Sequence, residues 1–403
     1  MHKTSVGLDI ADHTIEIIEL AEENGNINVL NLGNFALSPN IVKNGIIENK
    51  EKLAEAIKKI FSSTKPAPIT TKKIIFALPE SQVYIHSFYL GVHDKKDRDE
   101  LILQEIKSNV PIKANDLSFS YKIILESSEK TEIIAIVASQ KVVKEWINFF
   151  KSIKIEVEVL DIETLAVLRG LFPNKIEKIF CVLDIGSRTS HIAIFGSLGL
   201  YYSFSSYVAG DSITKALSTS LDLKISEAES LKLKEGLLSN DKKIVEIIKN
   251  ELNKLVKTLK ESFDYVKVEK QKEVEEIVVI GGTSKLKGLL EFLKKELSQP
   301  ISIGSVKIYD KRIPIIYVEA YGLALRGLDK KWEKSDLAFS LDIKKEKTRK
   351  NEIVITKENN KISQLFQLLK FEKIDKKIRN QILILVSVLF FGVVILLVVS
   401  SMK

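Results

Sequence analysis

Hydrophobic and polar positions alternate along the chain with two periods, one typical of strands and one typical of helices. Short runs with a period of two, or of continuous apolar character, predict β-strands, whereas apolar positions three and four residues apart predict helices. The strand patterns occupy residues 4–9, 15–20, 73–78, 83–90, 117–125, 132–138, 180–185, 191–195, 200–206 and 276–280. The helical patterns occupy residues 50–62, 96–108, 140–151, 162–171, 213–221, 226–234 and 242–267. Because both kinds of segment follow one another throughout, the sequence predicts an α/β fold.

The longest helical pattern, 242–267, carries a single apolar stripe. Its members are Ile244, Ile248, Leu252, Leu255, Leu259, Phe263 and Val266. Such a stripe serves either a coiled-coil dimer or packing against the same lobe. Three heptads lie near the lower limit for a coiled coil, so we expect this helix to pack on its own lobe.

A continuous apolar run stands near the C-terminus at 382–399, interrupted only by Ser387 and Gly392. Its length matches the ~30 Å hydrocarbon core of a bilayer, so we expect a transmembrane helix at 381–401. Basic residues crowd the N-terminal flank of this run, which predicts that the body stays in the cytosol and that the chain is a single-pass protein of the cytoplasmic (inner) membrane. The preceding segment, 330–380, is polar and basic and is expected to be a flexible linker.

The positive charge of the chain belongs to this C-terminal part. The formal net charge is +8, and residues 330–403 hold 16 of the 61 Lys and Arg but only 8 of the 53 Asp and Glu. The body before residue 330 is therefore neutral, so we expect no nucleic-acid partner. A single cysteine, Cys181, excludes an internal disulfide framework, and the five histidines show no metal-ligand spacing.

Two segments of the body repeat one pattern, 175 positions apart. An apolar strand ends in Asp9 in the first copy and in Asp184 in the second, and each is followed by a turn of small or polar residues and a further alternating strand. Either segment alone reads as an ordinary β-hairpin. The repetition predicts two similar lobes facing each other across a cleft, which is a favoured place for ligands.

A third segment, 277–290, is a buried strand that breaks at Gly281 and Gly282 and restarts as a helix. Glycines at such a break let the backbone approach a flat ligand closely, and a helix N-terminus favours anions. Hairpin turns can direct backbone N–H groups at phosphate oxygens, and a carboxylate can hold the waters of Mg²⁺. The three segments together predict a nucleotide site.

These segments resemble those of the actin-like ATPase superfamily, whose fold pairs two lobes around ATP. LDIADHT and LDIGSRT are similar to its two phosphate motifs, and VVIGGTSKLKGL is similar to its adenosine motif. Further stretches, such as VAGDSIT and AYGLALRG, resemble the PilM family of type IV pilus assembly and its relative FtsA. The resemblance covers about residues 4–328. It implies a two-lobed core at 1–82 and 158–329, with an inserted subdomain at 83–157.

The resemblance also implies the site residues, with ATP and Mg²⁺ as cofactors. The catalytic carboxyls that it implies are Asp9 and Asp184, which hold Mg²⁺ through water. The cofactor-binding residues that it implies are Asp12, Thr14, Gly186, Ser187, Thr189, Gly210, Asp211, Glu229, Lys232, Gly281, Gly282 and Thr283.

The first hairpin departs from the pattern of the family. The family usually has a Gly-Ser-Ser-Ser turn followed two residues later by Lys, whereas here the turn runs from Ala11 to Thr14 and Glu16 stands in the place of the Lys. Asp12 and Glu16 add negative charge near a polyphosphate, so we expect weakened nucleotide binding and weak or absent hydrolysis. An alternative is that His13 supplies the missing cation.

The resemblance therefore implies a cytosolic, nucleotide-binding scaffold of an inner-membrane type IV pilus or type II secretion-like platform. The membrane span predicts that the scaffold is tethered by its own helix, and the partners expected are PilN-like and PilO-like platform proteins, membrane lipid and a second copy of the chain. The alternative is a filament-forming ATPase of the FtsA type that acts in cell division.

Overall fold

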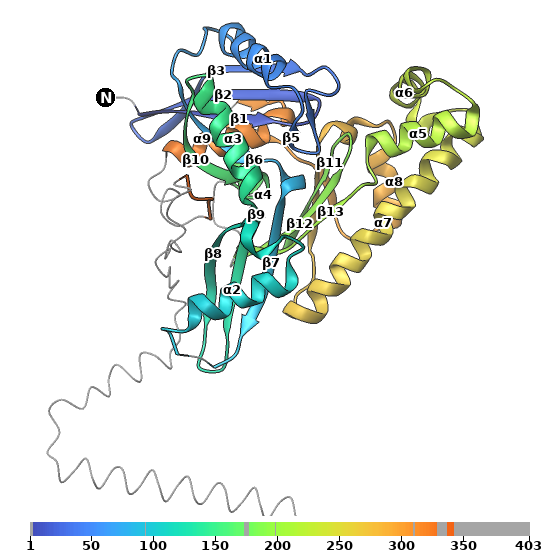
Figure 1. Ribbon diagram of the computed structural model, residues 1–403. Coiled ribbons are helices and arrows are strands. Elements are labelled where there is room, and N and C mark those ends of the chain that lie inside the picture. Colours follow the sequence, from blue (N-terminus) through green and yellow to red (C-terminus); the bar gives the residue numbers. More distant parts are fainter. Residues whose placement is uncertain are drawn as a thin grey trace, which may run out of the picture. The chain divides into compact units, whose positions relative to one another are not determined.

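The computed structural model describes residues 3–92, 94–172, 177–197, 199–308, 311–328 and 337–341 (Figure 1). The membrane span expected at 381–401 lies outside these residues, as does most of the linker expected at 330–380. The described part, 337–341, is not a flexible linker: Leu337 and Phe339 are buried, and the backbone N–H of Phe339 donates to the carbonyl oxygen of Leu160 at 2.9 Å. None of the helices in the described ranges is long and apolar enough to cross a membrane.

The first lobe is built on a five-stranded sheet with the order β10-β6-β1-β2-β3. Strands β1, β2 and β3 form an antiparallel meander, and β6 and β10 continue the sheet in parallel. The strands are β1 Lys3–Ile10, β2 Thr14–Glu23, β3 Asn26–Ala36, β6 Lys73–Leu78 and β10 Glu156–Ile162, with a small hairpin of β4 Val42–Lys43 and β5 Ile46–Ile47. The helices of this lobe are α1 Lys50–Ser63, α3 Gln140–Ser152, α4 Glu163–Leu171 and α9 Val318–Leu328, which share a hydrophobic core with the sheet.

The second lobe repeats this arrangement with the order β13-β12-β11-β14-β15. Again an antiparallel meander is continued by two parallel strands, and β11 takes the place that β1 has in the first lobe. The strands are β11 Phe180–Ile185, β12 Ser190–Gly196, β13 Gly199–Ser206, β14 Glu276–Ile280 and β15 Ile301–Ile303. The helices are α5 Gly210–Leu221, α6 Ile225–Lys234, α7 Lys242–Lys270 and α8 Leu289–Glu296, and a short hairpin follows with β16 Val306–Ile308 and β17 Lys311–Ile313. The two-lobed α/β fold predicted from the repeated hairpin is thereby confirmed.

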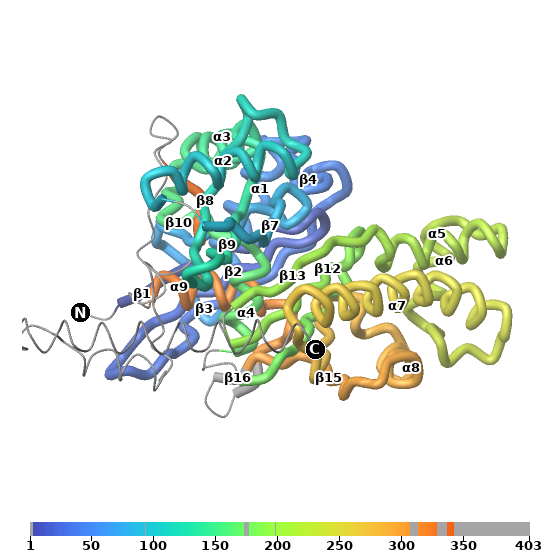
Figure 2. The backbone as a smooth tube through the Cα atoms, turned by 90° about the horizontal axis from the view of Figure 1, so that it is seen from below, coloured from blue at the N-terminus to red at the C-terminus, as the bar shows by residue number. Residues whose placement is uncertain are grey.

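Helix α7 packs on its own lobe, as its apolar stripe predicts. Ile248, Leu252, Leu255 and Leu259 are buried in the same core as the strands of the second sheet. Figure 2 shows α5, α6 and α7 extending together away from that sheet. The stripe therefore serves the interior of the lobe.

A third, three-stranded sheet with the order β7-β9-β8 lies within the expected insertion 83–157. Its elements are β7 Val83–Leu90, α2 Arg98–Asn109, β8 Leu117–Glu126 and β9 Thr131–Ser139. Sheet and helix enclose a core of their own that includes Phe88, Ile102 and Ile133. In contrast, Trp146 of α3 is buried in the core of the first lobe, and its Nε1 donates to the carbonyl oxygen of Gly45 at 3.0 Å.

Helix α9 lies in backbone contact with two neighbours because glycine stands at both contacts. A Cβ at Gly322 would lie 1.8 Å from the carbonyl oxygen of Ala166 in α4, and a Cβ at Gly7 would lie 1.9 Å from the carbonyl oxygen of Ala320. Only a residue without a side chain permits so close an approach. As a result, the first turns of α4 and α9 lie beside each other near the end of β1.

A buried ion cluster holds the same helices to the sheet. The carboxylate of Asp161, at the end of β10, pairs with Arg169 of α4 and with Arg326 of α9, whose Nη1 lies 2.7 Å from Asp161 Oδ1. All three side chains are almost completely buried. This cluster joins β10, at the edge of the first sheet, to helices α4 and α9.

Candidate functional site

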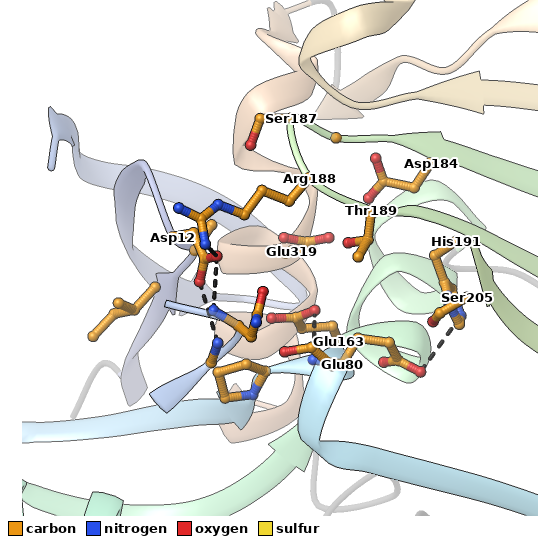
Figure 3. Close-up of a pocket in the computed structure, with 17 residues that line it drawn as sticks. Asp12, Glu80, Glu163, Asp184, Ser187, Arg188, Thr189, His191, Ser205 and Glu319 are labelled. Carbon is orange, nitrogen blue, oxygen red and sulfur yellow. Dashed lines mark hydrogen bonds and ion pairs between the residues drawn. The ribbon is translucent and has the colours of Figure 1, made fainter. Parts of the chain in front are cut away.

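A cavity of about 150 Å³ lies between the lobes, where the two hairpins and the first turns of α4 and α9 meet (Figure 3). The first lobe contributes Asp12 from the turn after β1, and the second lobe contributes the loop 186–189 after β11. Five residues that the resemblance assigns to the site line this cavity, namely Asp12, Asp184, Gly186, Ser187 and Thr189. The structure therefore brings both hairpin turns to one cavity.

The floor beneath this cavity is rich in carboxyl groups. Asp9 and Glu16 face each other as partners in the β1–β2 ladder and are 3% and 5% exposed. Glu163 and Glu319 stand in the first turns of α4 and α9 and line the cavity together with Asp184. A carboxylate in a first helical turn is favoured by the helix dipole, but its neighbours here carry the same charge.

Burial raises the pKa of each of these carboxyl groups. Desolvation and then the charge of Asp9 raise the pKa of Glu16, Glu163 and Glu319 well above the usual range. Burial likewise raises the pKa of Asp9, and it raises that of Asp184 to about 6. Glu319 hydrogen-bonds both Asp9 and Asp184, so this group holds protons readily or requires a cation to neutralise it.

One strong cation reaches into the cavity from the second hairpin. The Nη1 of Arg188 lies 3.1 Å from the carboxylate of Asp12, and this pair spans from one lobe to the other (Figure 3). The same carboxylate accepts hydrogen bonds from the backbone N–H groups of Asn44, at 2.8 Å, and Gly45, at 3.2 Å. The turn between β4 and β5 therefore fixes Asp12 in place.

His191 forms a second link between the lobes, which the sequence did not single out. It stands on β12 opposite Asp184, and its Nε2 lies 3.1 Å from the hydroxyl of Thr164 in α4 and 3.4 Å from the carboxylate of Glu80. The backbone N–H of Glu80 in turn donates to Glu163 at 3.0 Å. Hydrogen bonds thus connect the second sheet to the acidic floor.

The remaining predicted residues of the second lobe gather behind the loop 186–189. The hydroxyl of Thr283 and the backbone N–H of Gly210 both donate to the carbonyl oxygen of Gly186, at 2.8 and 3.1 Å, and the N–H of Asp211 donates to that of Ser187 at 2.7 Å. Gly281 has a φ of +84°, and a Cβ there would lie 2.1 Å from Asp184. Glycine is therefore required where β14 meets the end of β11.

Lys232 and Glu229 lie on α6 and face α5. The Nζ of Lys232 is buried and donates to the carbonyl oxygen of Gly210 at 3.1 Å and to the hydroxyl of Thr214 at 2.9 Å, and it pairs with Glu229 at 2.7 Å. Although partial burial opposes ionisation, the hydrogen bonds from Lys232 and Thr214 hold the pKa of Glu229 below its usual value. This network fixes the second-lobe wall beside the two glycines of the β14 break.

Among the candidate site residues named from the first hairpin, only Asp12 lines the cavity; Asp9 and Glu16 lie beneath it, and Thr14 and His13 lie apart from it. Thr14 starts β2 and forms a hydrogen bond with Glu16. His13, the alternative cation, lies 3.9 Å from Asp211, which is 56% exposed.

The residues present suit a nucleotide with Mg²⁺ in their chemistry. A Cβ at Gly282 would meet open space, which leaves room for a flat group. Carboxylate oxygens, such as those of Asp9 and Asp184, are the ligand type that Mg²⁺ prefers, and Mg²⁺ commonly takes only one or two of them and keeps its waters. The described residues contain no group of three or more His, Cys, Asp or Glu arranged to hold a metal ion.

The chain is similar to proteins of known families and structures. It is 25% identical to the cell division protein FtsA of Staphylococcus epidermidis over 352 residues, which cover 74% of this chain and 73% of that protein. The structure of the PilM-PilN type IV pilus biogenesis complex matches with a TM-score of 0.70 and 21% identity, over 81% of this chain and 98% of the other. The ethanolamine utilization protein EutJ from Carboxydothermus hydrogenoformans matches with a TM-score of 0.51 and 17% identity, over 80% and 89%.

These matches in structure identify the actin-like two-lobed fold. The sequence profile of the family described as type IV pilus assembly protein PilM matches residues 7–308, which is most of the chain and includes both hairpins and the β14 break. The chain therefore belongs to the PilM family of type IV pilus assembly proteins.

Proposed function

We propose that the chain is a nucleotide-binding scaffold of the type IV pilus assembly platform at the inner membrane. The observation that carries the proposal is that the two hairpin turns meet at one interlobe cavity, with Thr283 of the β14 break hydrogen-bonded to the second turn, in a member of the PilM family. Nucleotide binding in such a cleft determines how far the two lobes close, and partner proteins respond to the degree of closure.

ATP with Mg²⁺ is the proposed ligand. Asp9 and Asp184 would hold the metal through water, the loop 186–189 would offer backbone N–H groups to phosphate, and Gly281, Gly282 and Thr283 would underlie the nucleoside. When bound, Mg²⁺ supplies the positive charge that neutralises phosphate. The acidic floor, with Glu16 buried beside Asp9, disfavours the negative charge that develops during phosphoryl transfer, so we expect binding with weak or absent hydrolysis.

Nucleotide affinity tests the site. Fluorescently labelled ATP with Mg²⁺ should bind the wild-type chain, and Asp184→Ala should weaken binding at least tenfold, since it removes a charged group from the metal end. Asp94→Ala is the matched control, because Asp94 is 73% exposed and lies outside the cleft. Equal affinity of wild type and Asp184→Ala would remove the nucleotide site from the proposal.

The partner and the membrane attachment follow from the family and from the C-terminal sequence. We propose a PilN-like membrane protein as the partner, by analogy with the solved PilM-PilN complex, with PilO-like proteins and anionic lipid nearby. The apolar run 382–399 and its basic flank support a tether of the chain itself. Deletion of 342–403, which leaves the buried Leu337 and Phe339 in place, should move the body to the soluble fraction after cell lysis, and persistence in the membrane fraction would contradict the tether.

A filament-forming ATPase in cell division is the second candidate, favoured by the similarity to FtsA. It requires continuous phosphate release and sedimentation that increases with protein concentration in the presence of ATP. The scaffold requires neither, so both measurements on purified full-length chain in detergent separate the two functions.

A further inference from the structure

The carboxyl groups of the cavity oppose the binding of any ligand that carries phosphate. Glu80, Glu163, Asp184 and Glu319 all line it, and each carboxylate would repel a polyphosphate. Among the described residues that line the cavity, Arg188 is the one Lys or Arg.

Arg188 is positioned to change partners. Its side chain is 25% exposed and reaches across the cavity to Asp12, with Asp211 as a second carboxylate at 4.0 Å from its Nε. Asp12 is 13% exposed and accepts two backbone N–H groups of the β4–β5 turn. Because those two hydrogen bonds do not involve the arginine, Asp12 keeps most of its stabilisation when Arg188 leaves.

We propose that Arg188 is the phosphate-binding cation of this cleft and that Asp12 competes with the ligand for it. A phosphate oxygen pair matches the planar fork of a guanidinium as well as a carboxylate does, so a nucleotide phosphate can take the place of Asp12. The ion pair that joins the lobes is then exchanged for one between the ligand and the second lobe. This inference rests on the proposed nucleotide site and names the residues that determine its affinity.

The exchange predicts that substitutions of Arg188 and of Asp12 change ATP affinity in opposite directions. Arg188→Gln should weaken ATP binding about ten- to a hundredfold, the range expected for a hydrogen-bonded charged group, and Arg188→Lys should weaken it less. Asp12→Asn should strengthen ATP binding by up to about fivefold, since it removes a partly exposed competitor. In the Asp12→Asn/Arg188→Gln double variant the gain should disappear.

Equilibrium binding of ATP with Mg²⁺ and of adenosine to the full-length chain tests the exchange. Adenosine carries no phosphate, so its affinity should be the same in wild type and in all four variants, which also shows that the variants are folded. ATP binding unchanged in Arg188→Gln but weakened in Asp184→Ala would overturn the role of Arg188 and leave the nucleotide site standing. Binding of neither ATP nor adenosine by the wild-type chain would overturn the site and this inference together.

Discussion

Replacement of Asp184 by Asn should stabilise the ligand-free protein. Burial raises the pKa of this carboxyl from 3.8 to about 6, so the folded state binds the proton more tightly than the unfolded state. For such a group, stability is lost as the pH rises from the unfolded to the folded pKa, and the loss is complete above the latter. This rise in pKa lowers the free energy of unfolding by about 3 kcal/mol at pH 8 and by about half of that at pH 5.

Urea unfolding at both pH values without nucleotide measures this difference. Asn keeps the shape of the side chain and can still hydrogen-bond Glu319, so Asp184→Asn should gain about 3 kcal/mol at pH 8 and about 1.5 kcal/mol at pH 5. Asp94→Asn, at a 73% exposed position, should change stability little at either pH. An Asp184→Asn protein that is no more stable than wild type at pH 8 would refute the conclusion that burial of the Asp184 carboxylate destabilises the folded protein.

Three further substitutions test how the cleft is supported. Asp161→Ala should cost about 3–5 kcal/mol in urea unfolding, because two arginines that are 1% exposed lose the carboxylate that they share; a cost below 1 kcal/mol would contradict the importance of the cluster. Lys270→Met should cost about 1–3 kcal/mol, because it leaves the Glu132 carboxylate of the inserted sheet unpaired, and with Glu132→Gln the combined cost should be less than the sum. Gly322→Ala should lower the melting temperature or prevent folding, because its Cβ would lie 1.8 Å from a carbonyl oxygen of α4; a wild-type melting temperature would refute the close contact.

The repeated hairpin made the two-lobed fold predictable. Both copies place an apolar strand before Asp9 or Asp184 and an alternating strand after it, and local pattern of this kind is enough to define a hairpin. The structure gives both copies the same neighbours, since β6 pairs in parallel with β1 as β14 does with β11. Strand β3 escaped prediction because Asn-rich segments have low β-propensity, although antiparallel pairing with β2 along its length forms it.

The acidic floor was not predictable from local pattern. Glu163 and Glu319 are 156 positions apart, and no periodic pattern joins them to Asp9, although Glu319 stands directly before the stretch AYGLALRG. Their common feature is a place in the first turn of a helix, where a carboxylate is ordinary. The close approach of α4 and α9 at Gly322 brings them together, and such long-range packing leaves no periodic signal. Arg188, in contrast, lay within a recognised turn, but its pairing with Asp12 depends on the other lobe.

In the ligand-free cleft, both the acidic floor and the Asp12–Arg188 pair avoid leaving unneutralised charge. Raised pKa values let protons neutralise the carboxyl groups, and Asp12 neutralises the one arginine among the described residues that line the cavity. A phosphate ligand without a metal is repelled by the carboxylates, and a metal without phosphate leaves the ion pair between Arg188 and Asp12 intact. Under the proposed function both arrangements are replaced only when phosphate and metal arrive together, and the replacement breaks an ion pair between the lobes. Under the same proposal, ligand binding would be coupled to the contact between the lobes, as a scaffold requires, and the carboxyl-rich floor would disfavour fast hydrolysis.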